Sequence, residues 1–145
     1  MKISTTWFGT VDLADTAILT FPEGILGFEA EQEYCLTEHA PNSPFLWMQA
    51  VHTPSLAFVV INPFEHFLDY DIVITDADVV HLRIASPEDV KVITLVTIGE
   101  QEITTNLVGP IVVNQTKRLA RQIVLSDSRY GTRHLLPTRT AQPTR

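Results

Sequence analysis

Short apolar runs rich in β-branched residues alternate with polar and proline-containing segments along this chain. Residues 56–61 are continuously apolar, as in a strand with neither face in water, and residues 90–98 form a longer β-branched run. Further strands are predicted at residues 2–7, 9–13, 17–21, 32–37 and 45–51, where the pattern is shorter and partly alternating. The pattern predicts a mainly β protein with residues 56–61 at the heart of its core.

Residues 104–114 combine strand-forming side chains with polar residues and a proline, and we expect them to form the central hairpin arm of the domain. Apolar side chains occupy both odd and even positions between 107 and 113, as in a strand covered on two sides. Pro110 has no N–H to donate, so this strand needs an edge or a bulge at that point. Residues 114–117 supply turn chemistry before the apolar residues 119–125 run back, which predicts an antiparallel pair.

The pattern changes between residues 65 and 85, where Val79 and Leu82 fall at helical spacing. A short helix is predicted to begin near Asp76, because aspartate at an N-cap or in the first turn satisfies unpaired N–H groups and the helix dipole. One further helical turn is expected at residues 86–89, before the long strand. The whole chain is thus predicted to be a compact, mainly antiparallel β-barrel-like single domain with one or two short helices.

Four aspartates crowd this helical region: Asp69, Asp71, Asp76 and Asp78. They are interpreted as a solvated acidic face and as a candidate docking surface for a basic partner. The alternative is a metal site that includes His66 or His81. A calcium-type loop needs converging oxygen ligands and a glycine at its turn, and no glycine lies between Gly27 and Gly99. No metal and no cofactor is therefore predicted.

With 145 residues, 45% of them hydrophobic, the chain fits one domain, which we place at residues 1–136. Residues 137–145 lack hydrophobic periodicity and are predicted to be a disordered tail. Cys35 is the single cysteine, has apolar neighbours, and is expected to be a buried, inert thiol in a reducing compartment. No signal peptide and no membrane-spanning run are recognised in the sequence.

The charge is divided unevenly along the chain. Residues 1–116 contain three basic and sixteen acidic residues, a net charge of −13, whereas residues 117–145 contain seven basic residues and one acidic residue. Such an acidic body repels a nucleic-acid backbone and attracts basic proteins, although acidic surfaces also serve solubility alone. The basic residues Lys117, Arg118 and Arg121 do not form one stripe on a strand, and we interpret them as surface charges that protect a hairpin edge.

Catalytic motifs are missing from the sequence. The five histidines (His39, His52, His66, His81 and His134) are scattered, and none stands in a recognisable arrangement with a nucleophile or an acid. The chain is therefore predicted not to be an enzyme. The alternative that stays open is a small-molecule-binding barrel, or a small enzyme, that uses an interior pocket.

Several segments and single residues form one recognisable pattern in their order and spacing. The earlier segments are residues 21–29, 54–58, 62–64, 69–70 and 88–98. The later positions are Asn106, Leu107, Pro110, Ile111, Asn114, Arg118, Ala120, Gln122, Ile123 and Tyr130. Together they resemble the FliW family of flagellar assembly factors over most of the chain.

This resemblance implies a non-enzymatic cytoplasmic protein, monomeric when unbound, that binds flagellin and the small RNA-binding regulator CsrA. It implies that CsrA is sequestered, so that repression of flagellin translation is relieved, and that flagellin competes for the protein and couples its synthesis to export. Asn106, Leu107 and Pro110 are candidates either for partner binding or for bracing the hairpin. Asp69, Asp71, Asp76 and Asp78 are the candidates for contact with the basic regulator.

Overall fold

A computed structural model describes residues 2–6, 9–12, 18–38 and 42–136 of the chain. The tail predicted to be disordered, residues 137–145, lies outside the described residues. So do His39 and the ends of some predicted strands, such as Trp7 and Leu13.

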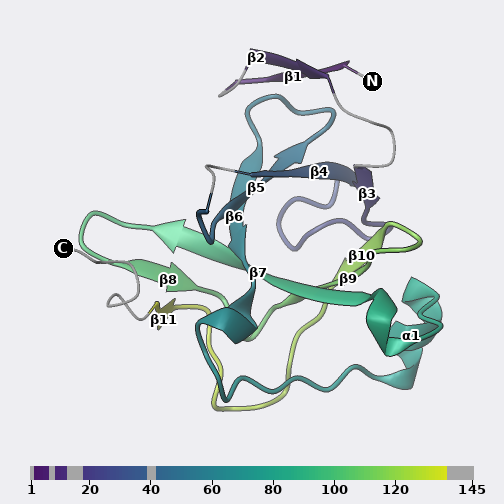
Figure 1. The fold of residues 1–145 in the computed structure, drawn as a ribbon, viewed down its shortest axis with the longest axis vertical. Helices are drawn as coiled ribbons and strands as arrows, with labels where there is room; N and C mark the ends of the chain where they lie inside the picture. The colour runs from purple at the N-terminus through teal and green to yellow at the C-terminus, as the bar shows by residue number, and fades with distance from the viewer. Residues whose placement is uncertain (1, 7–8, 13–17, 39–41, 137–145) are drawn as a thin grey trace.

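A closed barrel of seven strands dominates the fold (Figure 1). Neighbouring strands pair antiparallel except at one joint, where β3 and β10 run parallel and share the single register pair Leu119 and Thr20. The predicted fold class, a mainly antiparallel barrel in one unit, is confirmed. In order around the barrel the strands are β7 (Val90–Ile98), β6 (Ala57–Ile61), β5 (Leu46–Ala50), β4 (Glu33–Glu38), β3 (Ile18–Thr20), β10 (Leu119–Gln122) and β9 (Ile111–Asn114).

Strand β7 closes the barrel because its nine residues serve two neighbours in succession. Residues 90–93 pair with β9, and residues 94–96 pair with β6. The last part of β7 leaves the barrel and pairs with β8 (Ile103–Thr105), which in turn pairs with β11 (His134–Leu135). The reversal predicted after residue 98 is confirmed, since Gly99 N–H donates to the carbonyl of Glu102 at 2.9 Å.

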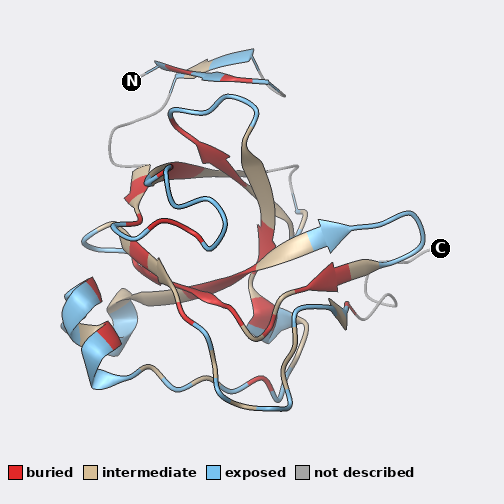
Figure 2. Ribbon diagram, turned by 180° about the vertical axis from the view of Figure 1, so that it is seen from behind, coloured by how far each residue is buried: buried red, intermediate tan, exposed pale blue. Residues whose placement is uncertain are grey.

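Apolar side chains fill the interior of the barrel. Figure 2 shows the buried positions, in red, along several strands of the barrel. Tyr34 is fully buried there, with its ring edge-on to Phe21 at a centroid distance of 5.2 Å. Burial, and secondarily the charge of Glu31, raises the pKa of Tyr34 to about 12. The buried members of this core are Leu19, Phe21, Ile25, Tyr34, Met48, Ala50, Val60, Ile93, Ile111, Val113 and Ala120.

Two smaller elements cover the outside of the barrel. A hairpin of β1 (Lys2–Thr5) and β2 (Gly9–Asp12) packs through Ile3 against Cys35 and Val51. Cys35 is buried, as predicted, and burial raises the pKa of its thiol. On another face, helix α1 (Asp76–Leu82) buries Leu82 against Val112 of β9.

The predicted helix start is confirmed, but the N-cap is Thr75 rather than an aspartate. Thr75 Oγ1 accepts a hydrogen bond from the N–H of Asp78 at 3.1 Å, and the Asp78 carboxylate accepts from the N–H of Thr75 at 3.3 Å. This reciprocal pair is a capping box. The predicted single turn before β7 is also confirmed, as a 3-10 helix at Pro87–Asp89.

The prediction of one continuous strand over residues 104–114 is wrong. Strand β8 ends at Thr105, residues 106–110 form a loop, and β9 begins at Ile111. The Asn106 side chain accepts a hydrogen bond from Gly109 N–H at 2.9 Å, so a local side-chain turn replaces the ladder there. Pro110 therefore precedes a strand and does not mark a bulge within one. The antiparallel pair of β9 and β10 is confirmed.

Two other strands are shorter than expected. β10 ends at Gln122, although the N–H groups of Ile123 and Leu125 continue the line by donating to the carbonyls of Pro110 and Val108. In β6 only Val60 and Ile61 are buried, so the prediction that neither face meets water fails for its first half. The run is still central, because β6 pairs with both β5 and β7.

The turn at residues 22–30 covers one end of the barrel and inserts Ile25, which is 1% exposed, into the core. Gly24 and Gly27 both adopt positive φ, at 71° and 88°. A Cβ added to Gly24 would lie 2.6 Å from the Cα of Glu29, whereas nothing lies within 4 Å of the corresponding position at Gly27. Glycine is therefore favoured at position 24 by both the positive φ and the close approach of Glu29, and at position 27 by the positive φ alone.

Replacing Gly24 by alanine is expected to destabilise the protein more than the same change at Gly27. Gly27→Ala introduces only the strain of a positive φ, which is expected to lower the free energy of unfolding by about 1 kcal/mol. Gly24→Ala adds a backbone clash and is expected to cost about 3 kcal/mol. Urea-induced unfolding followed by tryptophan fluorescence gives both values. Equal losses would show that the turn relaxes and that the close approach is unimportant.

Asn114 is expected to contribute strongly to stability because it is fully buried and joins two segments. Its Nδ2 donates to the carbonyls of Leu82 and Arg83 at the end of α1, and its Oδ1 accepts from the N–H groups of Thr116 and Lys117. Asn114→Ala leaves these groups without partners and is expected to lower the free energy of unfolding by about 2–4 kcal/mol.

The neighbouring variant Gln115→Ala is the control, because the side chain of Gln115 is exposed and makes a long contact, 3.4 Å, with the carbonyl of Glu88. Its backbone N–H, which donates to the carbonyl of Asp89, is kept in this variant. Gln115→Ala is expected to change the free energy of unfolding by less than about 0.5 kcal/mol. Similar small effects of both substitutions would contradict the role assigned to Asn114.

Candidate partner-binding surfaces

The four aspartates proposed for docking do not form one group. Asp69, Asp71 and Asp76 are exposed, but Asp78 is 8% exposed. The Asp78 side chain caps α1 through Thr75, and its Oδ1 lies 3.3 Å from Nη1 of Arg121. Asp78 is therefore used within the structure. Asp69 and Asp71 face solvent on the segment that leads to the helix, and Asp76 faces solvent at its first residue.

Aromatic residues fix the position of that segment. The hydroxyl of Tyr70 donates to the carbonyl of Leu107 at 2.6 Å, and Asp71 N–H donates to the hydroxyl of Tyr130 at 3.0 Å. The two rings pack edge-on with centroids 4.8 Å apart, and burial raises the pKa of Tyr70. Asp69 and Asp71 are thus displayed on backbone that is anchored at Tyr70.

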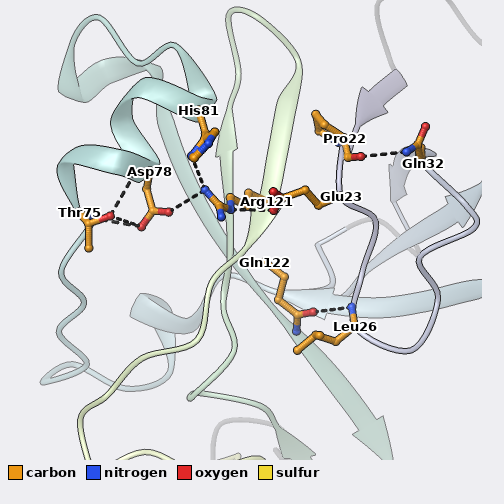
Figure 3. A network of polar contacts seen from close by, with 9 residues as sticks. All are labelled: Pro22, Glu23, Leu26, Gln32, Thr75, Asp78, His81, Arg121 and Gln122. Atoms are coloured by element: carbon orange, nitrogen blue, oxygen red, sulfur yellow. Dashed lines mark hydrogen bonds and ion pairs between the residues drawn. The ribbon is translucent and has the colours of Figure 1, made fainter.

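Arg121 of β10 joins three segments that are distant in the sequence (Figure 3). Its Nε lies 3.1 Å from Oε1 of Glu23, and its Nη1 contacts both Asp78 and, at 2.6 Å, Nδ1 of His81. Because a guanidinium only donates, His81 Nδ1 is the acceptor in this contact. The interpretation of Arg121 as a charge that merely protects a hairpin edge is wrong, since it links the 22–30 turn to α1.

The residues shared with the family pattern have internal roles. Leu107 is 2% exposed, and the carbonyl of the buried Pro110 accepts from Ile123 N–H. Asn106 closes the turn that ends at Gly109, as described above. Gln122 uses both ends of its amide, accepting from Leu26 N–H at 3.1 Å and donating to the Gly109 carbonyl at 3.0 Å. These positions brace the β8–β9 loop, and their contact with a partner stays a prediction.

A cleft of about 650 Å³ opens beside the 22–30 turn, at a place that the sequence did not single out. Within it, Nε2 of His52 lies 2.7 Å from a carboxylate oxygen of Glu33, and Glu31 is buried. Sequence reasoning missed it because its walls come from segments about twenty residues apart, and no local motif marks them. Its lining residues are Thr20, Gly27, Phe28, Glu29, Ala30, Glu31, Gln32, Glu33, His52, Thr53 and Leu56.

Three of the described histidines contact three different partners. His52 contacts Glu33, His81 contacts Arg121, and His134 Nε2 accepts from Gly131 N–H at 2.7 Å. Across the described ranges no three His, Cys, Asp or Glu side chains are placed to hold one metal ion. Nor does any helix in those ranges have the length and apolar character needed to cross a membrane.

Comparisons with known proteins agree over nearly the whole chain. The family model described as FliW protein matches residues 2–136. The flagellar assembly factor FliW of Magnetococcus marinus is 42% identical over 130 residues, covering 88% of this chain and 80% of that protein. The protein with the same description from Geobacillus sp. (strain WCH70) is 37% identical over 145 residues, covering 98% and 100%.

A crystal structure described as that of the flagellar assembly factor FliW superposes on the fold with a TM-score of 0.86. The two chains are 36% identical, and the match covers 93% of this chain and 96% of the other. The family model, the fold similarity and the sequence identity thus agree, and the chain belongs to the FliW family of flagellar assembly factors.

Proposed function

We propose that this chain acts by protein–protein binding, with flagellin and the translational regulator CsrA as its two partners. Binding of CsrA removes it from flagellin mRNA and relieves repression of translation. Flagellin competes for the same protein, so that flagellin leaving the cell by export releases the protein to bind CsrA again. Membership of the FliW family over residues 2–136 is the observation that carries this proposal.

The charge of the chain supports a basic partner. Residues 1–116, which include most of the barrel, carry a net charge of −13. A regulator that holds RNA must itself be basic, and an acidic protein increases the rate of its encounter with such a partner. The same charge disfavours direct RNA binding by this chain.

The packing of the barrel favours a binding protein over the alternative of a barrel with an interior ligand pocket. Within the described part of the chain, the eleven buried residues of the core fill the interior with mainly apolar side chains. A ligand or substrate pocket needs polar groups that converge on an open cavity. We therefore propose a non-enzymatic role, in the cytoplasm, for a chain that is monomeric when unbound.

Titration calorimetry against purified CsrA from the same organism is expected to give saturable binding, because the proposal requires a direct complex. The same titration repeated after saturation with flagellin is expected to show no binding of CsrA. If neither titration gave heat of binding, the two-partner proposal would be refuted, and the family assignment would stand. If both partners bound at the same time, only the proposed competition between them would be refuted.

Reversal of the charges at Asp69 and Asp71 is expected to slow the association of CsrA by about three- to tenfold at low salt. Both side chains are exposed, so the melting temperature is expected to stay unchanged. Stopped-flow or surface-based kinetics at several salt concentrations measures the rate, whose salt dependence is expected to become weaker.

Two comparisons make this test specific. The variant Glu100→Lys with Glu102→Lys makes the same charge change at the exposed β7–β8 turn and is expected to slow association less. Asp78→Asn is expected to lower the melting temperature, since Asp78 caps α1 and pairs with Arg121. A melting loss for the Asp69 and Asp71 variant would assign these residues to structure and not to docking.

A further inference from the structure

An exposed aromatic residue lines the cleft beside the 22–30 turn. Phe28 is 43% exposed, and its ring packs edge-on against Phe58 with 5.2 Å between the centroids. The half-buried Leu56 also lines the cleft. A side chain that packs on a neighbouring ring while much of its apolar surface meets water resembles the anchor residues of protein interfaces.

The same cleft carries negative charge. Its lining includes Glu29, Glu31 and Glu33 and no Lys or Arg, while Nε2 of His52 lies 2.7 Å from Glu33. Glu31 is 5% exposed, and its carboxylate accepts hydrogen bonds from His52 N–H, Glu33 N–H and the Thr53 hydroxyl, at 3.2, 3.2 and 2.9 Å.

These three neutral donors satisfy the lone pairs of Glu31 but do not cancel its charge. None of the described Lys or Arg side chains forms an ion pair with it. The pKa of Tyr34 is raised mainly by burial and, as a second cause, by the charge of Glu31. This effect of Glu31 is a second sign of the negative potential here. A cation placed in the cleft would interact with this potential at reduced dielectric, where Coulomb energies are larger than in water.

The backbone around the cleft is already ordered. Ile25 is anchored in the barrel core, Leu26 N–H donates to Gln122, and Gly27 N–H donates to Oε2 of Glu29 at 3.1 Å. Binding at this place therefore needs little additional ordering of the protein, which lowers the entropic cost of association.

A long basic side chain matches both features of the cleft. The apolar stem of an arginine or lysine can pack on Phe28 and Leu56 while its charged end lies near Glu29 and Glu33. We propose that this cleft binds an arginine or lysine side chain of a basic protein partner. The proposal rests on the proposed function, in which that partner is CsrA, and it separates a short-range anchor here from the long-range attraction by Asp69 and Asp71.

The charge requirement is tested with the double variant Glu29→Gln and Glu33→Gln, which keeps side-chain shape and leaves an acceptor for Gly27 N–H. Its affinity for CsrA, measured by titration calorimetry, is expected to fall by about tenfold or more. The matched control is Glu100→Gln with Glu102→Gln, which removes the same charge at the exposed tip of the β7–β8 hairpin (Figure 1) and is expected to change the affinity by less than about twofold.

The apolar requirement is tested on the same turn. Phe28→Ala is expected to raise the dissociation rate of CsrA by about tenfold, because anchor residues act mainly on dissociation. Leu26→Ala is its control, since Leu26 is more exposed, at 64%, but does not line the cleft and lies instead beside Gln122 (Figure 3). It is expected to leave the rate nearly unchanged.

The outcomes separate this proposal from the proposed function. If the unaltered protein binds CsrA and the cleft variants bind as tightly as their controls, the cleft assignment is overturned and the function stands. Equal weakening by both glutamate pairs would also overturn it, because only total charge would then matter. If the unaltered protein does not bind CsrA, the proposed function fails and this assignment of the occupant fails with it.

Discussion

Strand β7 makes closure of the barrel possible, since it pairs first with β9 and then with β6. Without the pairing of β7 with β9, the sheet would stay open, and β9 would be one of its edges. The length of β7 also supplies the outward hairpin with β8, which in turn pairs with the last strand β11. One nine-residue strand thus pairs with three others, β6, β8 and β9.

Local patterns in the sequence were sufficient for much of this architecture. The β-branched run of β7, the turn that follows it and the acidic start of α1 are all specified by neighbouring residues, whose effects act within a few positions. The apolar pattern gave a wrong prediction at residues 106–110, where apolar side chains occupy both odd and even positions. There the side chain of Asn106 bonds to the backbone of Gly109 and forms a turn, which hydrophobic periodicity does not report.

The surfaces were harder to predict because they depend on contacts between remote residues. Asp76 and Asp78 are the same type of residue two positions apart. Only Asp78 forms an ion pair with Arg121, which lies 43 positions further along the chain. Similarly, the Glu31 carboxylate accepts hydrogen bonds from His52 and Thr53, which follow it in the sequence only after strands β4 and β5. A sequence shows where carboxylates are frequent, but the fold decides which of them are used internally and which face solvent.

The parallel joint between β3 and β10 has a mechanical consequence. Backbone pairing there is limited to one register position and the bond from Thr20 N–H to the Arg118 carbonyl, so side chains supply much of the attachment through Arg121 with Glu23 and Gln122 with Leu26. Glu23 is 62% exposed, and exposed ion pairs contribute at most about 1 kcal/mol and weaken in salt. The β3–β10 joint therefore has the shortest backbone pairing described in the barrel, and we expect local opening to begin between these two strands.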